Sequence, residues 1–289
     1  MIGRSVRLVL GALVLIACGA AVFFAQRYRE DQRAEASLRM RIEGIVTASG
    51  REELACADVA ADQPLVLLAL GQSNAGNHGS PASVKRMVTV VVDGRCFRSI
   101  APLPGGTGTG GSIWERLPES LAAGGYRRPV VVSVLAVDAS HIGDWVDEGS
   151  PLRQRLAAHV KSMLAAGLPP QFVLWQQGEA DAKAGNADES YASSLDRLAT
   201  LLGEAGADAP ILLARSTVCR STPNAAIRSA IDGLIAKDRR FRSGPDTDRL
   251  SGEEYRDGCH LTVAGLDGAA GLWAEAIGHL VAPGSAKQE

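Results

Sequence analysis

The chain has 289 residues, of which 46% are hydrophobic and 21% are charged, with a formal net charge of −2. This composition supports a globular fold with a sizeable core and excludes an intrinsically disordered chain. The small net charge argues against a general nucleic-acid-binding protein, because such proteins usually carry a basic surplus. Only 4% of the residues are aromatic, so a stacking platform for single-stranded nucleic acid is not indicated either.

An uncharged apolar run lies near the start of the chain. It covers Leu8–Ala25 and follows Arg4 and Arg7. Its length is near the lower limit for a helix that spans a bilayer. We therefore interpret residues 1–25 as a signal anchor or signal peptide and expect the membrane to be a partner of this helix. The expected location is the inner membrane, with the rest of the chain exported to the periplasm.

A lipoprotein is the alternative interpretation of the same run. Leu15–Cys18 reads LIAC, and Cys18 would carry the lipid after cleavage. Residues 26–60 are charged and contain few large apolar side chains, so we predict a juxtamembrane stalk or linker there. Residues 61–289 are then the exported domain under either interpretation.

Apolar, β-rich runs alternate with amphipathic stretches from about residue 61 onward. The runs expected to form strands are Leu65–Leu70, Val88–Val92, Val130–Val137, Phe172–Trp175 and Ile211–Ala214. The stretches expected to form helices are Ser112–Ala123, Pro151–Ala166, Ser190–Ala205, Asn224–Lys237 and Ala264–Leu280. Short, continuously apolar strands that alternate with helices are typical of a parallel sheet covered on both faces. The sequence therefore predicts an α/β domain with a parallel five-stranded sheet.

Polar residues follow several of the predicted strands, where open α/β sheets carry their reactive groups. The first strand ends on Gly71-Gln72-Ser73-Asn74. A serine in such a turn is structural in most proteins, and the G-x-S-x-G nucleophile elbow is absent.

Two Asp-x-x-His pairs offer a base and an orienting acid for a serine nucleophile. Asp257 and His260 lie near the C-terminus, and Asp138 and His141 follow a predicted strand. Spacing alone leaves both pairs open.

The glycine-rich stretch Gly105–Gly111 contains the letters of G-x-G-x-x-G. No predicted strand precedes it and no Lys-Ser/Thr follows, so both nucleotide-binding signatures fail on context. We expect a loop whose backbone N–H groups approach a ligand. No group of His, Cys or carboxylate residues has metal-ligand spacing, so we expect neither a metal nor a cofactor.

Four cysteines follow the apolar run, at positions 56, 96, 219 and 259. An even number in an exported chain suggests two disulfides, and three pairings are possible. We favour Cys56–Cys96 and Cys219–Cys259.

Four segments together resemble the SGNH hydrolase superfamily, and more narrowly its sialate O-acetylesterase-like branch, which includes carbohydrate esterase family 6. The segments are GQSN (Gly71–Asn74), GGSIW (Gly110–Trp114), WQQGEADA (Trp175–Ala182) and DGCH (Asp257–His260). The resemblance covers about residues 62–283. It implies a flavodoxin-like three-layer α/β/α sandwich and a serine triad without a metal.

The resemblance also implies a role for individual residues. Ser73 would be the nucleophile, His260 the base and Asp257 its orienting acid. The oxyanion hole would use the N–H groups of Ser73 and Gly111 and the side chain of Gln177.

Further positions are assigned to substrate binding or loop support: Gln72, Asn74, Gly110, His141, Glu179 and Asp181. The chain departs from the family pattern at Gln176, where the family often has His. It also departs at Asp138 and Ala139, where the family usually has Gly and Thr. The assignment of His141 as a local substrate contact rests on this second departure.

The resemblance predicts a serine esterase that removes O-acetyl groups from carbohydrate through an acyl-serine intermediate. The substrate partner would be an acetylated sialic acid or another acetylated sugar of the cell envelope or exopolysaccharide. Two alternatives stay open: an O-acetyltransferase that uses the same triad, and a catalytically weak polysaccharide-binding module. The sequence does not choose an oligomeric state.

Overall fold

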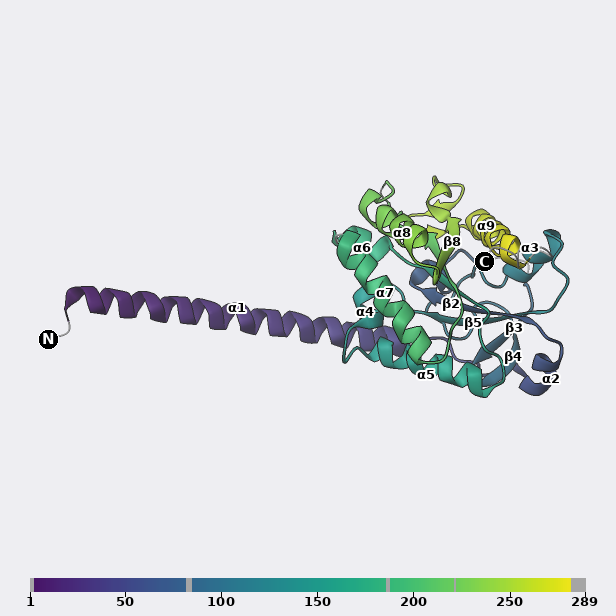
Figure 1. The fold of residues 1–289 in the computed structure, drawn as a ribbon, viewed down its shortest axis with the longest axis horizontal. Coiled ribbons are helices and arrows are strands. Elements are labelled where there is room, and N and C mark those ends of the chain that lie inside the picture. The colour runs from purple at the N-terminus through teal and green to yellow at the C-terminus, as the bar shows by residue number, and fades with distance from the viewer. Residues whose placement is uncertain (1–2, 82–84, 186–187, 221, 282–289) are drawn as a thin grey trace. The chain divides into compact units, whose positions relative to one another are not determined.

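The computed structural model describes residues 3–81, 85–185, 188–220 and 222–281, with the side chains of residues 4–17 and 188 left aside. The chain divides into two compact units, Met1–Met40 and Arg41–Glu289. The long helix α1 (Arg4–Glu43) supplies the first unit (Figure 1). The second unit therefore begins inside the segment for which a stalk is predicted.

The predicted membrane anchor, Leu8–Ala25, falls largely on residues whose side chains lie outside the described part of the chain. Among the residues that the structure does describe, none of the helices combines the length and apolar character needed to cross a membrane. The anchor therefore stays a prediction from the sequence.

One large sheet forms the centre of the second unit (Figure 1). Within the described residues it has eight strands, in the order β1-β4-β3-β5-β2-β6-β7-β8. Their bounds are β1 Glu52–Leu54, β2 Leu65–Gly71, β3 Val88–Val92, β4 Arg95–Ser99, β5 Val130–Ala136, β6 Phe172–Gln176, β7 Ile211–Arg215 and β8 Phe241–Asp246. Strands β3, β5, β2, β6, β7 and β8 are parallel, whereas β1 and β4 join the β3 edge in antiparallel pairing.

The five predicted strands are present as β2, β3, β5, β6 and β7, but the prediction of a five-stranded sheet is wrong. The three additional strands lie at the two ends of the sheet. Glu52–Leu54, the edge strand, carries charged side chains as edge strands commonly do, and its neighbour Arg95–Ser99 carries them as well. Phe241–Asp246 contains a glycine and a proline. None of the three therefore has the continuous apolar run that marks a strand buried on both faces.

Helices cover both faces of the sheet and complete the predicted α/β/α sandwich (Figure 1). Their bounds are α2 Cys56–Ala61, α3 Leu117–Ala123, α4 Ile142–Val146, α5 Pro151–Ala165, α6 Glu179–Ala184, α7 Asp188–Glu204, α8 Ala225–Lys237 and α9 Val263–Val281. Helices α3 and α9 pack against each other on one face. On the opposite face, α7 packs against α4, α5 and α8. Two short 3-10 helices, η1 (Ser73–Ala75) and η2 (Thr247–Arg249), and a small hairpin of β9 (Arg256–Asp257) and β10 (His260–Leu261) lie in the connections.

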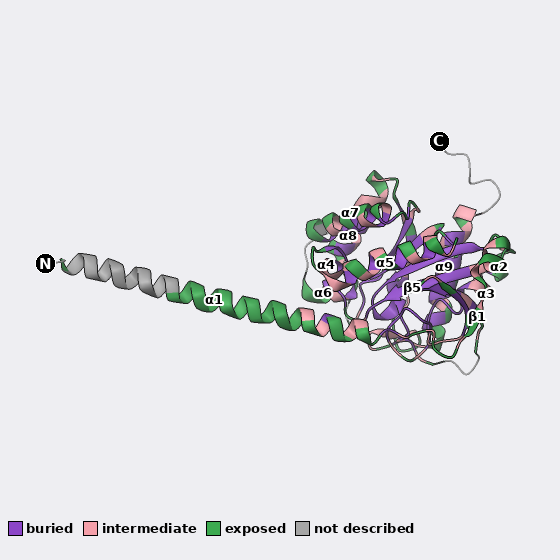
Figure 2. Ribbon diagram, turned by 90° about the horizontal axis from the view of Figure 1, so that it is seen from below, coloured by how far each residue is buried: buried purple, intermediate pink, exposed green. Residues whose placement is uncertain are grey.

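Strand β2 lies at the centre of the core, and all seven of its residues are buried. Successive side chains of a strand point to opposite faces. Leu65, Leu67 and Ala69 belong to the cluster that also contains Trp114 and Trp273. The rings of these two tryptophans lie 5.6 Å apart between centroids. Figure 2 shows the sheet as buried and the outer surfaces of the helices as exposed. Burial on both faces explains why β2 reads as an unbroken apolar run.

Both predicted disulfides are present and confirm the favoured pairing. Cys56 at the start of α2 is bonded to Cys96 on β4. Cys219, in the loop after β7, is bonded to Cys259, in the turn between β9 and β10. The remaining cysteine, Cys18, is free and exposed.

His159 gives the fold a specific pH dependence. This α5 residue is buried, and its Nε2 atom lies 2.7 Å from the Ser133 hydroxyl on β5. The Ser133 hydroxyl donates to the Val91 carbonyl, so Nε2 carries the proton and donates to it. Burial lowers the pKa of His159 to about 4. The neutral imidazole is therefore the form that the folded protein accommodates.

We expect the free energy of unfolding to fall between about pH 6.5, the ordinary pKa of histidine, and pH 4. Over this range His159 takes up a proton in the unfolded chain but stays neutral in the folded protein, so the unfolded state is favoured as the pH drops. The difference between the His159 pKa values of the unfolded and folded states corresponds to a loss of about 3 kcal/mol in the free energy of unfolding. Urea unfolding at several pH values measures the effect. His159→Gln should show a shallower dependence than the wild type, and equal slopes would contradict the prediction.

Candidate active site

The site begins where β2 ends. Gly71 has φ 146°, and a Cβ atom there would lie 2.1 Å from the main-chain oxygen of Gln176 on β6. Only glycine permits this close approach. The chain then turns into the 3-10 helix η1, whose first residue is Ser73. Ser73 is therefore held at the end of the central strand, between the ends of β5 and β6.

A pocket of about 590 Å³ opens at this edge of the sheet. Its lining comes from the segments that follow β2, β5, β6 and β7 and from the β9–β10 turn. The lining residues are Gln72, Ser73, Asn74, His78, Asp138, Ala139, His141, Glu179, Ala180, Lys183, Ala184, Cys219, Cys259 and His260. The carboxyl ends of parallel strands are where open α/β sheets bind ligands. The fold thus brings Ser73 and His260, which are far apart in the sequence, into one pocket.

Asn74 connects three of the loops around this pocket. Its Nδ2 atom donates to Oε1 of Glu179, at 2.8 Å, and to the Cys259 carbonyl oxygen, at 3.0 Å. The neighbouring Gln72 accepts the N–H of Ala180 through Oε1, at 3.1 Å. Gln72, Asn74 and Glu179 therefore all lie at the pocket and contact its loops. Glu179 is buried, and burial raises the pKa of its carboxyl group.

His260 is suited to accept a proton. Burial is the main influence on its imidazole and lowers its pKa below the usual value. The charge of Asp138 opposes this effect, followed by that of Asp257. A neutral imidazole at neutral pH is the form that acts as a general base. The ring of His78 lies 5.2 Å from that of His260 between centroids, and burial lowers the pKa of His78 as well.

The two Asp-x-x-His pairs of the sequence meet at this one pocket. Asp138, His141 and His260 all line it. Asp257 is exposed on β9, paired in register with His260 on β10, and lies outside the pocket wall. Asp138, which the sequence spacing pairs with His141, therefore exerts a larger electrostatic effect on His260 than Asp257 does.

His141 has a different environment from His260. Its Nδ1 atom lies 3.8 Å from Oδ1 of Asp181. Asp181 is fully buried, and its Oδ2 atom accepts the N–H of Ile142 at 3.0 Å. The nearby carboxylate of Asp181 is the main cause that raises the pKa of His141. The pocket thus holds histidines whose pKa values are shifted in opposite directions.

Two of the groups that the resemblance assigns to the oxyanion hole, Gly111 and Gln177, bond elsewhere. The N–H of Gly111 donates to the Gly79 carbonyl at 2.9 Å. Gln177 is fully buried, and its Nε2 atom donates to the Ser140 carbonyl and to Asp181. Neither residue lines the pocket, so the geometry does not support their assigned role in the oxyanion hole. Gly110, assigned to substrate binding or loop support, donates its N–H to the Asn77 carbonyl at 2.7 Å and also lies outside the pocket lining.

Several pocket residues were not assigned to the site from the sequence, among them His78, Ala139 and Lys183. His78 follows Ser73 by five positions, but it has no carboxylate at a recognisable spacing. Ala139 has φ 51°, a conformation that non-glycine residues seldom adopt. It lies in the segment that follows β5, the neighbour of β2, and this position at the carboxyl end of a strand is the signal that could have identified it.

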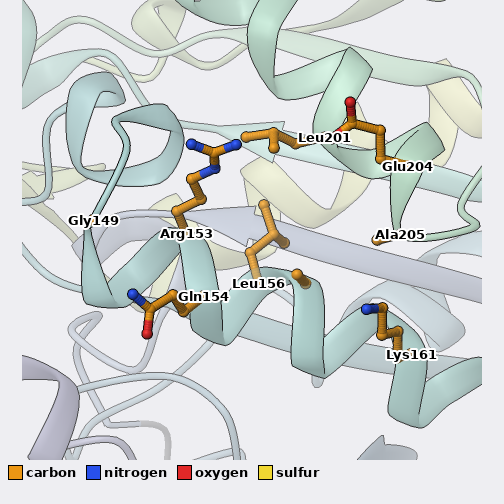
Figure 3. A pocket seen from close by; sticks show the side chains of 9 residues that line it. Gly149, Arg153, Gln154, Leu156, Lys161, Leu201, Glu204 and Ala205 are labelled. Carbon is orange, nitrogen blue, oxygen red and sulfur yellow. The ribbon is translucent and has the colours of Figure 1, made fainter.

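A second hollow lies between α5 and α7 and has a volume of about 420 Å³ (Figure 3). Arg153 and Lys161 approach it from α5, and Leu201 and Glu204 approach it from α7. Its lining contains no serine, cysteine or histidine. The hollow that contains Ser73 is therefore the candidate active site.

Comparisons with known proteins add information about the fold. No protein-family model matches the chain, and no curated protein matches it. A solved structure of an Arabidopsis thaliana protein is similar, with a TM-score of 0.59 and 18% identity over 74% of this chain and 97% of that chain.

Two other similar structures are esterases. A carbohydrate acetylesterase from Xanthomonas citri has a TM-score of 0.47 and 16% identity, over 74% of this chain and 56% of that one. A family 3 carbohydrate esterase from Talaromyces cellulolyticus has a TM-score of 0.47 and 16% identity, over 75% of this chain and 97% of that one. The mostly parallel sheet between two helical layers is an α/β sandwich, as the sequence predicts.

Replacement of Asp138 by Asn tests the electrostatics of the pocket. Asp138 raises the pKa of His260 more than Asp257 does, so its removal should lower that pKa further. We expect a larger decrease in Asp138→Asn than in Asp257→Asn. NMR titration of the histidine ring protons in the full chain measures both, with His260→Ala used to assign the signal. A larger decrease in Asp257→Asn would contradict the prediction.

Proposed function

We propose that the chain is a serine esterase that removes acetyl groups from carbohydrate. The observation that carries this proposal is the placement of Ser73 and His260 in one pocket, with the pKa of His260 lowered by burial. A hydroxyl nucleophile needs a neighbouring base that is neutral at working pH. The four segments that resemble the sialate O-acetylesterase-like branch support acetyl esters of sugars as the substrate class.

The proposed reaction proceeds through an acyl-serine. The Ser73 oxygen bonds to the ester carbonyl carbon while His260 takes the hydroxyl proton. His260 then gives that proton to the sugar oxygen as the carbon–oxygen bond of the ester breaks. Water attacks the acetyl-serine with His260 again as base, and acetate leaves with Ser73 restored. Asp138 and Asp257 favour the imidazolium that forms in each half of the cycle.

The tetrahedral intermediate needs hydrogen-bond donors for its oxyanion. We assign this role to the backbone N–H groups of Ser73 and Ala139. Ala139 replaces Gly111 in this proposal because the Gly111 N–H is bonded to Gly79, whereas Ala139 lines the pocket wall. The pocket volume of about 590 Å³ lies within the usual range for small-molecule sites, so a sugar ring with its acetyl group can enter.

We also propose that the domain works outside the cytoplasm, attached to the inner membrane through the apolar run Leu8–Ala25. Two disulfides in the second unit support export, because such bonds persist in oxidising compartments. Lipidation of Cys18 is the alternative form of attachment. Intact-mass analysis of membrane-extracted protein distinguishes them: loss of the first seventeen residues with added lipid mass would establish the lipoprotein.

Hydrolysis of p-nitrophenyl acetate by the full chain tests the catalytic assignment. Ser73→Ala and His260→Ala should each lower kcat/KM by about 1,000-fold or more, because each removes a member of one catalytic unit. His141→Ala, which leaves that unit intact, should stay within about tenfold of the wild type.

Two results would contradict the assignment. If wild type and Ser73→Ala release p-nitrophenol at the same rate, the esterase proposal fails. If His141→Ala abolishes turnover while His260→Ala does not, the base has been misassigned. Acetate release from a panel of acetylated sugars then identifies the substrate.

A further inference from the structure

The loop that carries His260 is covalently joined to another wall of the pocket. Cys259 directly precedes His260 and is bonded to Cys219 in the loop after β7. Both cysteines line the pocket together with Ser73 and His260. The disulfide therefore forms part of the surface that a substrate would meet.

A buried guanidinium joins the same two loops a second time. Nη1 of Arg256 donates to the carbonyl oxygens of Val218, at 3.2 Å, and Cys259, at 3.0 Å. Val218 directly precedes Cys219. Arg256 also donates to the carbonyl oxygens of Leu250, at 2.7 Å, and Thr247, at 3.1 Å. The β9–β10 turn is thus tied to the β7 loop through both a covalent bond and hydrogen bonds.

The same turn is also tied to the nucleophile. Asn74, the residue after Ser73, donates to the Cys259 carbonyl at 3.0 Å. The backbone of Cys259 therefore receives hydrogen bonds from Asn74 and Arg256, and its side chain is bonded to Cys219. The hairpin itself has only two residues in each strand. So short a ladder cannot position His260 without these additional contacts.

We propose that the Cys219–Cys259 disulfide is a positioning element of the active site, which holds His260 in reach of Ser73. This inference rests on the proposed function of the Ser73 site. It assigns a role to the bond in catalysis that is separate from its contribution to folding stability. Loss of the bond leaves the Arg256 contacts in place, so the domain stays folded while the base loses its fixed position.

The second disulfide is a matched control. Cys56–Cys96 and Cys219–Cys259 each join cysteines 40 residues apart, so their effects on the entropy of the unfolded chain are similar. Cys56–Cys96 ties α2 to β4, near one edge of the sheet, and neither residue lines the pocket. The two bonds therefore differ in their relation to the site.

The experiment compares Cys219→Ser/Cys259→Ser with Cys56→Ser/Cys96→Ser in the full chain, using p-nitrophenyl acetate. We expect kcat to fall at least about tenfold in the first variant and to stay within about twofold of the wild type in the second, since a small displacement of a catalytic group is costly. Thermal unfolding should show similar decreases in Tm for both. Equal kcat values in the two variants would overturn the proposal.

NMR titration of His260 gives a readout that does not depend on activity. In the wild type, burial holds the pKa of His260 below its usual value. Release of the turn to solvent in Cys219→Ser/Cys259→Ser should move this pKa towards about 6.5, and the control variant should not change it. Identical titration curves in all three proteins would overturn the positioning role.

Arg256→Lys provides a second variant with the disulfide intact. Lysine keeps the charge but cannot donate to four carbonyls in the planar arrangement of a guanidinium. Because the disulfide is intact, we expect the His260 titration of Arg256→Lys to stay closer to that of the wild type than to that of Cys219→Ser/Cys259→Ser. A shift as large as in Cys219→Ser/Cys259→Ser would contradict the proposal. If the wild type hydrolyses no ester, the proposed function fails, while these titrations still test the position of His260.

Discussion

The close approach of the β2 end to β6 is the constraint on which the site depends. A side chain at Gly71 would collide with the Gln176 carbonyl, so the two strand ends come together only with glycine there. This contact places η1 beside the start of α6. Asn74 can then reach Glu179 and Cys259, and through Cys259 the position of Ser73 is coupled to that of His260. Displacement of one strand end would therefore alter several loops together.

The electrostatics of the pocket follow from burial of the imidazoles and from the carboxylates that lie near each of them. Burial lowers the pKa of His260 and His78, whereas a buried carboxylate partner raises that of His141. One pocket thus contains imidazoles biased towards the neutral form and one biased towards the charged form. Asp138 lines the same pocket and moderates the effect of burial on His260. The arrangement suits a base that must accept a proton and hold it briefly.

The sequence predicted those parts of the fold that one-dimensional patterns encode. Buried parallel strands appear as apolar runs, so the runs beginning at Leu65 and Val130 were recognised, whereas the charged Arg95–Ser99 was not. The rule that reactive groups follow the strands of an open α/β sheet placed Ser73 and Asp138 at one edge of the sheet. It could not show that Asp138 influences His260, or that Gly111 donates to Gly79, because both depend on how distant loops fold back on one another.

The reactive residues of this site lie on segments with little regular structure of their own. Ser73 belongs to a single 3-10 turn and His260 to a two-residue strand, so main-chain ladders contribute little to holding them in place. Hydrogen bonds from side chains to the main chain hold these segments in place instead. Backbone carbonyls near the site accept hydrogen bonds from Asn74 and Arg256, and one covalent bond fixes the turn that carries the base. The positions of the reactive residues are fixed only while all of these contacts are present. Loss of one contact should therefore disturb the geometry of the site before it unfolds the domain.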